Sequence, residues 1–168
     1  MRQPGRPARW MPGEPMANPV LPVMRSLLIE RPARKQSYAQ LARALEADAE
    51  PLIARFVAAT DTPENRHQLR HIIGLERWGQ RRLRTALGEP PVSDEMDDYM
   101  PERGLSLADL CAAFAATRRE TVVLARQLEA RGIDGAQQVA HNQFDPLTLR
   151  GWLRYLNLHA RLEGRRVK

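Results

Sequence analysis

The stretch Leu107–Leu128, LADLCAAFAATRRETVVLARQL, decides the fold. Its apolar and threonine side chains recur every three or four residues, which is the spacing of one face of an α-helix that packs against other helices. These positions are Leu107, Leu110, Phe114, Thr117, Thr121, Leu124 and Leu128. Because Ser106 precedes the stretch as an N-cap and Gly132 follows it, the pattern predicts one long helix that ends at Gly132.

Two helices of the same kind are predicted upstream. The first begins at Ser37, because Ser37 and Gln40 have the spacing of a capping box. Pro51 interrupts its apolar pattern and predicts a kink or a fresh start. The second helix begins near residues 61–63 and stops at Gly88, which is followed by two prolines.

A last helix and two long connectors complete the pattern. The connectors are residues 89–105, which are acidic, and residues 133–146. The first is long for a tight helical hairpin, so we expect it to cross an end of the helical assembly. The last helix opens either at the Asp-Pro pair 145–146 or at Thr148, and it runs to about Gly164. Since strand patterns are absent from the sequence, we predict an all-α four-helix bundle with long crossover connectors.

The N-terminal residues 1–36 differ in composition from the rest. They are rich in proline and arginine and lack helical periodicity, which predicts a disordered or loosely docked extension. The bundle domain is then expected at 37–168. Four methionines are candidate translation starts: Met1, Met11, Met16 and Met24.

Composition favours a cytoplasmic globular protein. The chain has 168 residues, of which 43% are hydrophobic and 27% charged, and these values are ordinary for one globular domain. The sequence contains no apolar run long enough to span a membrane, and prolines break up the N-terminus where a secretory signal would need an apolar stretch. The single cysteine, Cys111, excludes an internal disulfide, fits a reducing compartment and is expected to fill space in the core.

Several function classes find no support in the sequence. The net charge of +6 arises mostly within the first 35 residues, and no basic helix with interspersed aromatics predicts specific nucleic-acid binding. The sequence also has no glycine-rich phosphate loop, G-x-S-x-G, paired cysteines or H-E-x-x-H. The acidic run 94–98 lacks the spacing of a calcium loop and is expected to be solvated.

Histidines on two of the predicted helices give the best functional clue. His159 and Glu163 lie one turn apart on the helix face that also carries Trp152. This face is otherwise apolar. His71 lies in the second helix, with His67 one turn before it. Because buried polar groups need partners, two helices that each direct a ligand-forming side chain inward suggest a metal site inside the bundle.

The same segments carry a resemblance to a known family. They are HIIGLERW at 71–78, the connector with His141, LTL at 147–149, and the closing helix with Tyr155 and His159. Together they resemble the DinB/YfiT-like superfamily over residues 38–164, most strongly at 67–90 and 141–163. Its members are four-helix bundles that commonly bind zinc or nickel through three histidines. One histidine lies in an H-I-x-x-x-E-like motif of the second helix, and two form an H-x-x-x-H pair in the last.

The resemblance implies a metal site of His71, His159 and Glu163. His71 matches the second-helix ligand and His159 the first histidine of the last-helix pair, while Glu163 stands where the family has the second histidine. Two imidazoles and a carboxylate form a known catalytic zinc arrangement, so we expect a divalent metal, zinc or nickel. The substitution is also consistent with a member that has lost its metal. The residues alone favour a different interpretation, with ordinary hydrogen-bonded histidines and a Glu163 carboxylate paired with Arg166.

Three functional hypotheses follow. In the first, the chain is a metal-dependent enzyme of the hydrolase or low-molecular-weight-thiol transferase type, in which a metal-bound water or thiolate is the nucleophile. In the second, it is a metal-binding or stress-associated module without turnover. In the third, the metal site is degenerate and the chain is a helical interaction module, expected as a homodimer. The sequence does not identify a substrate.

Other conspicuous residues have structural interpretations. His67 lies near a helix start and is expected to be exposed, whereas His141 is expected to support the site rather than to bind a metal. Glu76 lies in the same predicted helix as His71 but on a different face, which favours a salt bridge or a position at the core edge. Trp78 and Trp152 are expected in the core or at its rim, where either can line a pocket.

Overall fold

The computed structural model describes residues 23, 25–92, 94–142 and 146–168, and these residues are mostly helical. The helices are η1 (Arg25–Glu30), α2 (Arg31–Arg34), α3 (Tyr38–Ala58), α4 (Pro63–Arg84), η2 (Thr85–Leu87), η3 (Met96–Tyr99), α5 (Leu107–Ala130) and α6 (Leu149–Gly164). Two short strands, β1 (Gln138–Val139) and β2 (Leu147–Thr148), pair antiparallel. The predicted all-α class is therefore confirmed. The candidate starts Met1, Met11, Met16 and Met24 lie outside the described residues.

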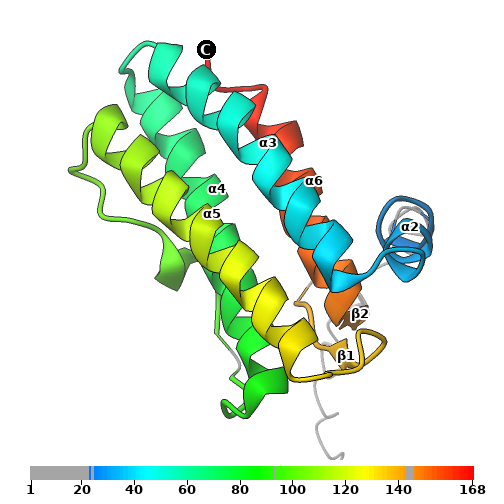
Figure 1. Ribbon diagram of the computed structural model, residues 1–168. Coiled ribbons are helices and arrows are strands. Elements are labelled where there is room, and N and C mark those ends of the chain that lie inside the picture. The colour runs from blue at the N-terminus through cyan, green and yellow to red at the C-terminus, as the bar shows by residue number, and fades with distance from the viewer. Residues whose placement is uncertain (1–22, 24, 93, 143–145) are drawn as a thin grey trace, which may run out of the picture.

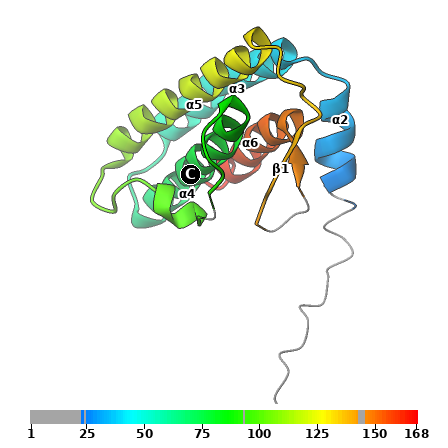
Figure 2. The same cartoon turned by 90° about the horizontal axis from the view of Figure 1, so that it is seen from below.

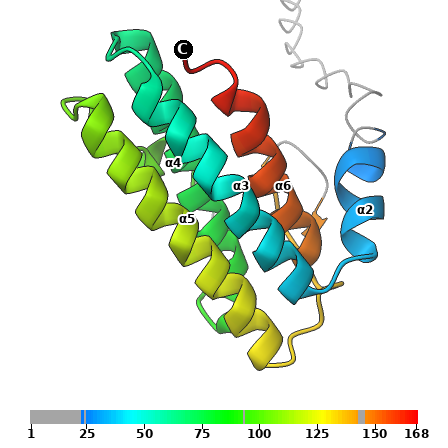
Figure 3. The same cartoon turned by 45° about the horizontal axis from the view of Figure 1, so that its top comes forward.

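The long helices α3, α4, α5 and α6 lie side by side (Figure 1). Helices α5 and α6 each lie against both α3 and α4, and the view from below shows the same arrangement (Figure 2). Helices α3 and α6 run in one direction, and α4 and α5 run in the other (Figure 3). Over the described part of the chain, no helix is long and apolar enough to cross a membrane.

The connector between α4 and α5 does not follow the predicted path. Because these two helices run in the same direction, the chain must return along the length of α4 before α5 begins (Figure 1). Helix η3, within this connector, lies against α4. The connector therefore covers a side of α4 rather than crossing one end of the assembly, and it brings Met96 and Met100 against Gly74.

Local capping signals place the helix starts where the sequence predicts them. Side-chain oxygens accept hydrogen bonds from first-turn backbone N–H groups at four N-caps, which are Ser37, Thr62, Ser106 and Thr148. At the other ends, Gly88 and Gly132 have φ angles of 103° and 65°. Glycine adopts this left-handed conformation without steric cost, which explains why the chain turns away at both positions.

Pro51 does not begin a new helix, so the fresh start, one of the two predicted alternatives, is wrong. The helix is continuous from Tyr38 to Ala58. Pro51 lies on its exposed side, where water can satisfy the carbonyl that loses its helical donor. The proline therefore leaves no buried carbonyl without a hydrogen-bond donor.

The core consists of two apolar clusters along the length of the helices. One contains Tyr38, Leu41, Leu45, Trp78, Leu83, Leu124, Leu128, Trp152, Leu153 and Leu156, among others. The second contains Leu52, Phe56, Leu69, Ile72, Ile73, Leu110, Cys111, Phe114 and Ala160, among others. The predicted seam of α5 is buried, as are Trp78 and Trp152, and Cys111 fills space as expected.

A buried polar network links the long helices. Glu76 on α4 and Arg118 on α5 form an ion pair of 2.9 Å, and each side chain is only 1% exposed. The Thr121 hydroxyl donates to the second Glu76 oxygen at 2.7 Å. Arg118 also donates to Asn157 of α6, whose amide donates to Asp48 of α3, both at 2.7 Å. The predicted salt bridge of Glu76 is confirmed. The burial of its partner, Arg118, was not predicted from the sequence.

The N-terminal segment that the structure describes is packed rather than loose. Residues 25–34 are helical, and Ile29, Glu30 and Ala33 are buried. The Glu30 carboxylate accepts hydrogen bonds from the Thr148 backbone N–H at 2.9 Å and from its hydroxyl at 3.0 Å. The disordered or loosely docked extension expected at 1–36 therefore does not apply to 25–34. A carboxylate at the start of α6 is favourable because it meets the positive end of the helix dipole.

Candidate functional site

His71 of α4 and His159 of α6 face each other. Their Nε2 atoms are 3.2 Å apart, and their ring centroids are 5.1 Å apart. Gly79 permits close approach of the two helices, since a Cβ there would lie 2.5 Å from Leu156 Cδ2. His159 borders the buried stripe of α6 that contains Leu156 and Ala160. The predicted convergence of the two histidines is therefore present.

Both imidazoles are held in the neutral form. Burial lowers the pKa of His71, and the charge of Glu163 opposes this effect in part. Burial, followed by the proximity of the second titratable ring, His71, and the positive charge of Arg166, lowers the pKa of His159 to about 3. Neutral imidazole is the form that binds metal ions, so neither ring has to lose a proton before a metal binds.

The distance between the histidines suits a shared metal ion. Two Zn–N bonds of about 2.0–2.1 Å, at an angle between 90° and tetrahedral, separate the nitrogens by about 3.0–3.4 Å. The observed 3.2 Å lies within this range. The same distance also fits a direct hydrogen bond in which one Nε2–H donates to the other Nε2. The two alternatives differ in whether a proton or a cation lies between the rings.

Glu163, the third predicted ligand, is engaged elsewhere. Its Oε2 accepts hydrogen bonds from Gln68 Nε2 at 2.8 Å and from Arg166 at 2.7 Å. The pairing with Arg166 is the alternative that the sequence left open. Within the described ranges, no three histidine, cysteine or acidic side chains lie close enough together to hold a metal ion. The structure thus brings two of the three predicted residues together.

A cavity of about 240 Å³ opens beside the histidine pair. It is lined by His71, Leu75, Trp78, Glu95, Met96, His141, Asn142, Tyr155 and His159. Three of the four histidines in the chain thus line one cavity. The residues come from α4, α6 and both connectors, so segments distant in the sequence enclose the site. Trp78 lines the cavity as well as the core, as expected.

His141 lies within an aromatic cluster at this cavity. Its ring stacks on Trp152 with a centroid distance of 4.9 Å, and it meets Trp78 and Tyr155 edge-on at 5.1 and 5.2 Å. The side chain is 8% exposed. Burial, together with the charge of Arg82, lowers the pKa of His141 to about 4. His141 therefore lines the cavity as a neutral imidazole, in agreement with its predicted supporting role.

Asp94 anchors the first connector to α4 at the cavity. Its carboxylate pairs with Arg82 at 2.7 Å and accepts hydrogen bonds from Trp78 Nε1 at 3.2 Å and from the Tyr99 hydroxyl. The expectation of a solvated acidic run is thus wrong at Asp94, although Asp97 and Asp98 are exposed. Sequence reasoning missed this residue because nothing within the run itself distinguishes Asp94 from its exposed neighbours.

Tyr155 places a phenol next to the pair. Its ring centroid is 6.0 Å from that of His159. Burial, assisted by the charge of Glu163, raises the pKa of Tyr155 to about 12. The hydroxyl therefore keeps its proton at neutral pH.

Compared with protein-family models, curated proteins and solved structures, the chain matches none.

Proposed function

We propose that the chain is a divalent-metal protein of the DinB/YfiT-like type, a four-helix bundle in which His71 and His159 hold zinc or nickel. The 3.2 Å separation of their Nε2 atoms is the observation that supports this proposal. The neutral state of both imidazoles and the cavity beside them add to it. Glu163 belongs to the proposal as a third ligand that must first leave Gln68 and Arg166.

The proposed activity is that of a metal-dependent hydrolase or low-molecular-weight-thiol transferase. A bound divalent metal would supply Lewis acidity and lower the pKa of a coordinated water or thiol. The chain itself provides the surroundings of that group. Trp78 and Leu75 form an apolar side of the cavity.

A second candidate function is non-catalytic metal binding, or a stress-associated helical module with a degenerate site. The observation that favours it is the engagement of Glu163 with Gln68 and Arg166. With two histidines in place, a metal would bind more weakly than in a site with three protein ligands. A homodimer is part of both proposals, and sedimentation velocity measures it directly.

Metal content tests the proposed site. The chain, purified without chelator or affinity tag, is analysed by mass spectrometry for zinc and nickel beside His159→Ala. We expect about one metal per chain in the wild type and loss of metal in the variant. His67→Ala is the matched control, because His67 is exposed and lies one turn from His71. Unchanged metal content in His159→Ala would overturn the ligand assignment.

Turnover separates the two candidate functions. Ester and amide substrates, and electrophilic substrates offered with and without a low-molecular-weight thiol, are assayed with the metal-loaded chain. A rate that His159→Ala abolishes and that Arg43→Gln, an exposed position on α3, retains supports the enzyme. Full metal occupancy without turnover in any of these assays supports the binding module.

A further inference from the structure

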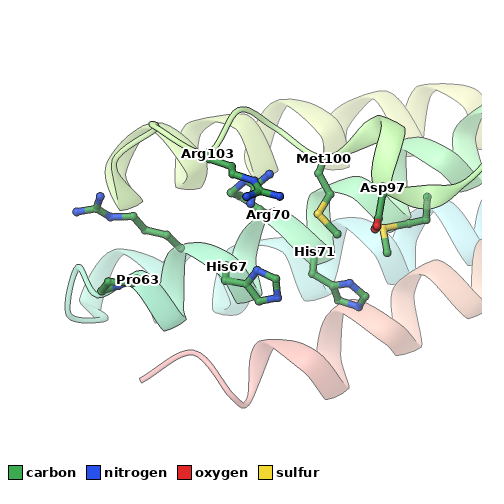
Figure 4. A pocket seen from close by; sticks show the side chains of 9 residues that line it. Pro63, His67, Arg70, His71, Asp97, Met100 and Arg103 are labelled. Carbon is green, nitrogen blue, oxygen red and sulfur yellow. The ribbon is translucent and has the colours of Figure 1, made fainter.

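A second pocket lies next to His71, on the side of α4 where the first connector returns (Figure 4). Its volume is about 770 Å³, and three arginines line it: Arg66, Arg70 and Arg103. We call it the arginine pocket. His67, His71, Met96, Asp97, Met100 and Pro63 complete the lining. His71 and Met96 also line the cavity of the histidine pair, so the two spaces share a wall.

The arginine pocket has hydrogen-bond donors that the protein does not use. Arg70 donates through Nε to the carbonyl of Pro101 at 2.7 Å, and neither of its terminal nitrogens has a partner among the described residues. Arg103 has no hydrogen bond or ion pair within the described part of the chain, and it is exposed. Arg66 is neutralised by Asp61 through its Nε. The donors of Arg70 and Arg103 therefore remain for a ligand.

The charge of the lining is positive. Asp97 is the one acidic side chain among the lining residues, which include three arginines. Arg70 and Arg103 line the same pocket, and in Figure 4 their side chains overlap in projection above His67. Planar guanidinium groups bind phosphate and carboxylate with paired hydrogen bonds. A concave surface of one charge sign also concentrates oppositely charged ligands.

We propose that the arginine pocket binds the phosphate or carboxylate group of a small anionic ligand whose other end reaches the histidine pair. This proposal rests on the proposed function, because it names the substrate class of that site. Arg70 and Arg103 bind the oxyanion, and His71 lies between it and the cavity. The part of the ligand beyond His71 then contacts Leu75 and Trp78. Neutral or cationic ligands gain nothing from the arginines.

Anion binding is measured on the metal-free full-length chain, so that phosphate has no metal to bind. Inorganic phosphate is titrated at constant ionic strength and followed by amide chemical shifts. Arg103→Gln and Arg70→Gln each remove one arginine charge, and Arg43→Gln, an exposed position on α3, is the matched control. We expect saturable binding that each pocket variant weakens about five- to tenfold and that the control leaves unchanged.

Acetate in place of phosphate identifies which oxyanion the pocket prefers. Tighter binding of phosphate assigns a phosphorylated ligand, and equal or tighter binding of acetate assigns a carboxylate. The same affinity in Arg103→Gln, Arg70→Gln and Arg43→Gln would overturn the proposal, as would the absence of saturable binding of both anions. Because Arg103 makes no hydrogen bond to any residue that the structure describes, Arg103→Gln should fold normally, and its melting curve verifies this.

Anion binding by the arginine pocket and metal binding by the histidine pair can be tested independently. The phosphate titration is repeated in His159→Ala, which removes a metal ligand and leaves the arginines in place. Retained phosphate binding in that variant, with loss in Arg103→Gln, supports the arginine pocket whatever the metal analysis gives. Metal binding that is intact in the wild type, with no arginine-dependent phosphate binding, overturns this proposal alone.

Discussion

His71 and His159 are 88 positions apart in the sequence, and their Nε2 atoms lie 3.2 Å apart. They are brought together by two antiparallel helices that approach closely at Gly79. Burial keeps both rings neutral by lowering the pKa of each. A neutral pair of this kind either shares a proton or binds a cation, and these alternatives respond differently to mutation.

Glu163→His would restore the histidine pair of the resembled family. We expect zinc affinity equal to or tighter than that of the wild type, because the variant adds an imidazole donor one turn from His159. The measurement is a competition titration against a chromophoric chelator. Glu163→Gln is the control, since it removes the charge and keeps the size. Loss of zinc binding in Glu163→His would show that this position lies outside the metal site.

Removing Arg118 should destabilise the fold severely. Arg118→Ala leaves the Glu76 carboxylate buried without its partner, and such a loss costs about 3–5 kcal/mol. Urea unfolding measures the free energy of unfolding. The exposed pair of Arg126 and Glu46 is the matched control, because Arg126→Ala should cost less than about 1 kcal/mol. Equal effects of the two variants would contradict the structural role of the network.

His141 should make stability depend on pH. Its pKa is about 4 in the folded chain, whereas an unperturbed histidine has a pKa of about 6.5. The unfolded state therefore binds the proton first, and the free energy of unfolding should fall as pH falls from about 6.5 to 4, by up to about 3 kcal/mol.

His141→Phe isolates this contribution, because phenylalanine can keep the contacts with Trp78, Trp152 and Tyr155. We expect a shallower dependence of stability on pH in the variant than in the wild type. His71 and His159 are present in both proteins and cancel in the comparison. Identical pH slopes for the two proteins would show that His141 is not buried in the neutral form.

Glu30 should hold the N-terminal segment against α6. Glu30→Ala leaves the Thr148 N–H and hydroxyl without their acceptor, which should cost about 1–3 kcal/mol. Amide hydrogen exchange should then be faster in residues 25–34. Glu50→Ala is the control because Glu50 is exposed on α3. Unaltered exchange in Glu30→Ala would mean that other contacts hold the segment.

The features that were predictable from the sequence are those with local causes. Ser37, Ser106 and Thr148 begin helices because their side chains cap the N–H groups that directly follow them. The seam of α5 is buried because its period matches that of the helix. The convergence of His71 and His159 followed from their positions on inward faces, together with a family resemblance.

The features that were missed depend on partners distant in the sequence. Arg118 is buried because Glu76 and Asn157 lie on the helices opposite it. Likewise, the contacts of Asp94 depend on the course of the connector. The connector returns along α4 because α4 and α5 run in the same direction, and this direction is not visible in the local sequence. The arginine pocket forms where that connector returns along α4, so no single stretch of sequence carries its signal.

The most direct test follows the imidazole nitrogens themselves. Zinc is titrated into the metal-free chain labelled with ¹⁵N in its histidine rings. We expect the Nε2 resonances of His71 and His159 to shift together and to saturate at one zinc per chain, while those of exposed His67 stay in place. Shifts confined to His67, or unchanged resonances of His71 and His159, would contradict a metal centre between α4 and α6.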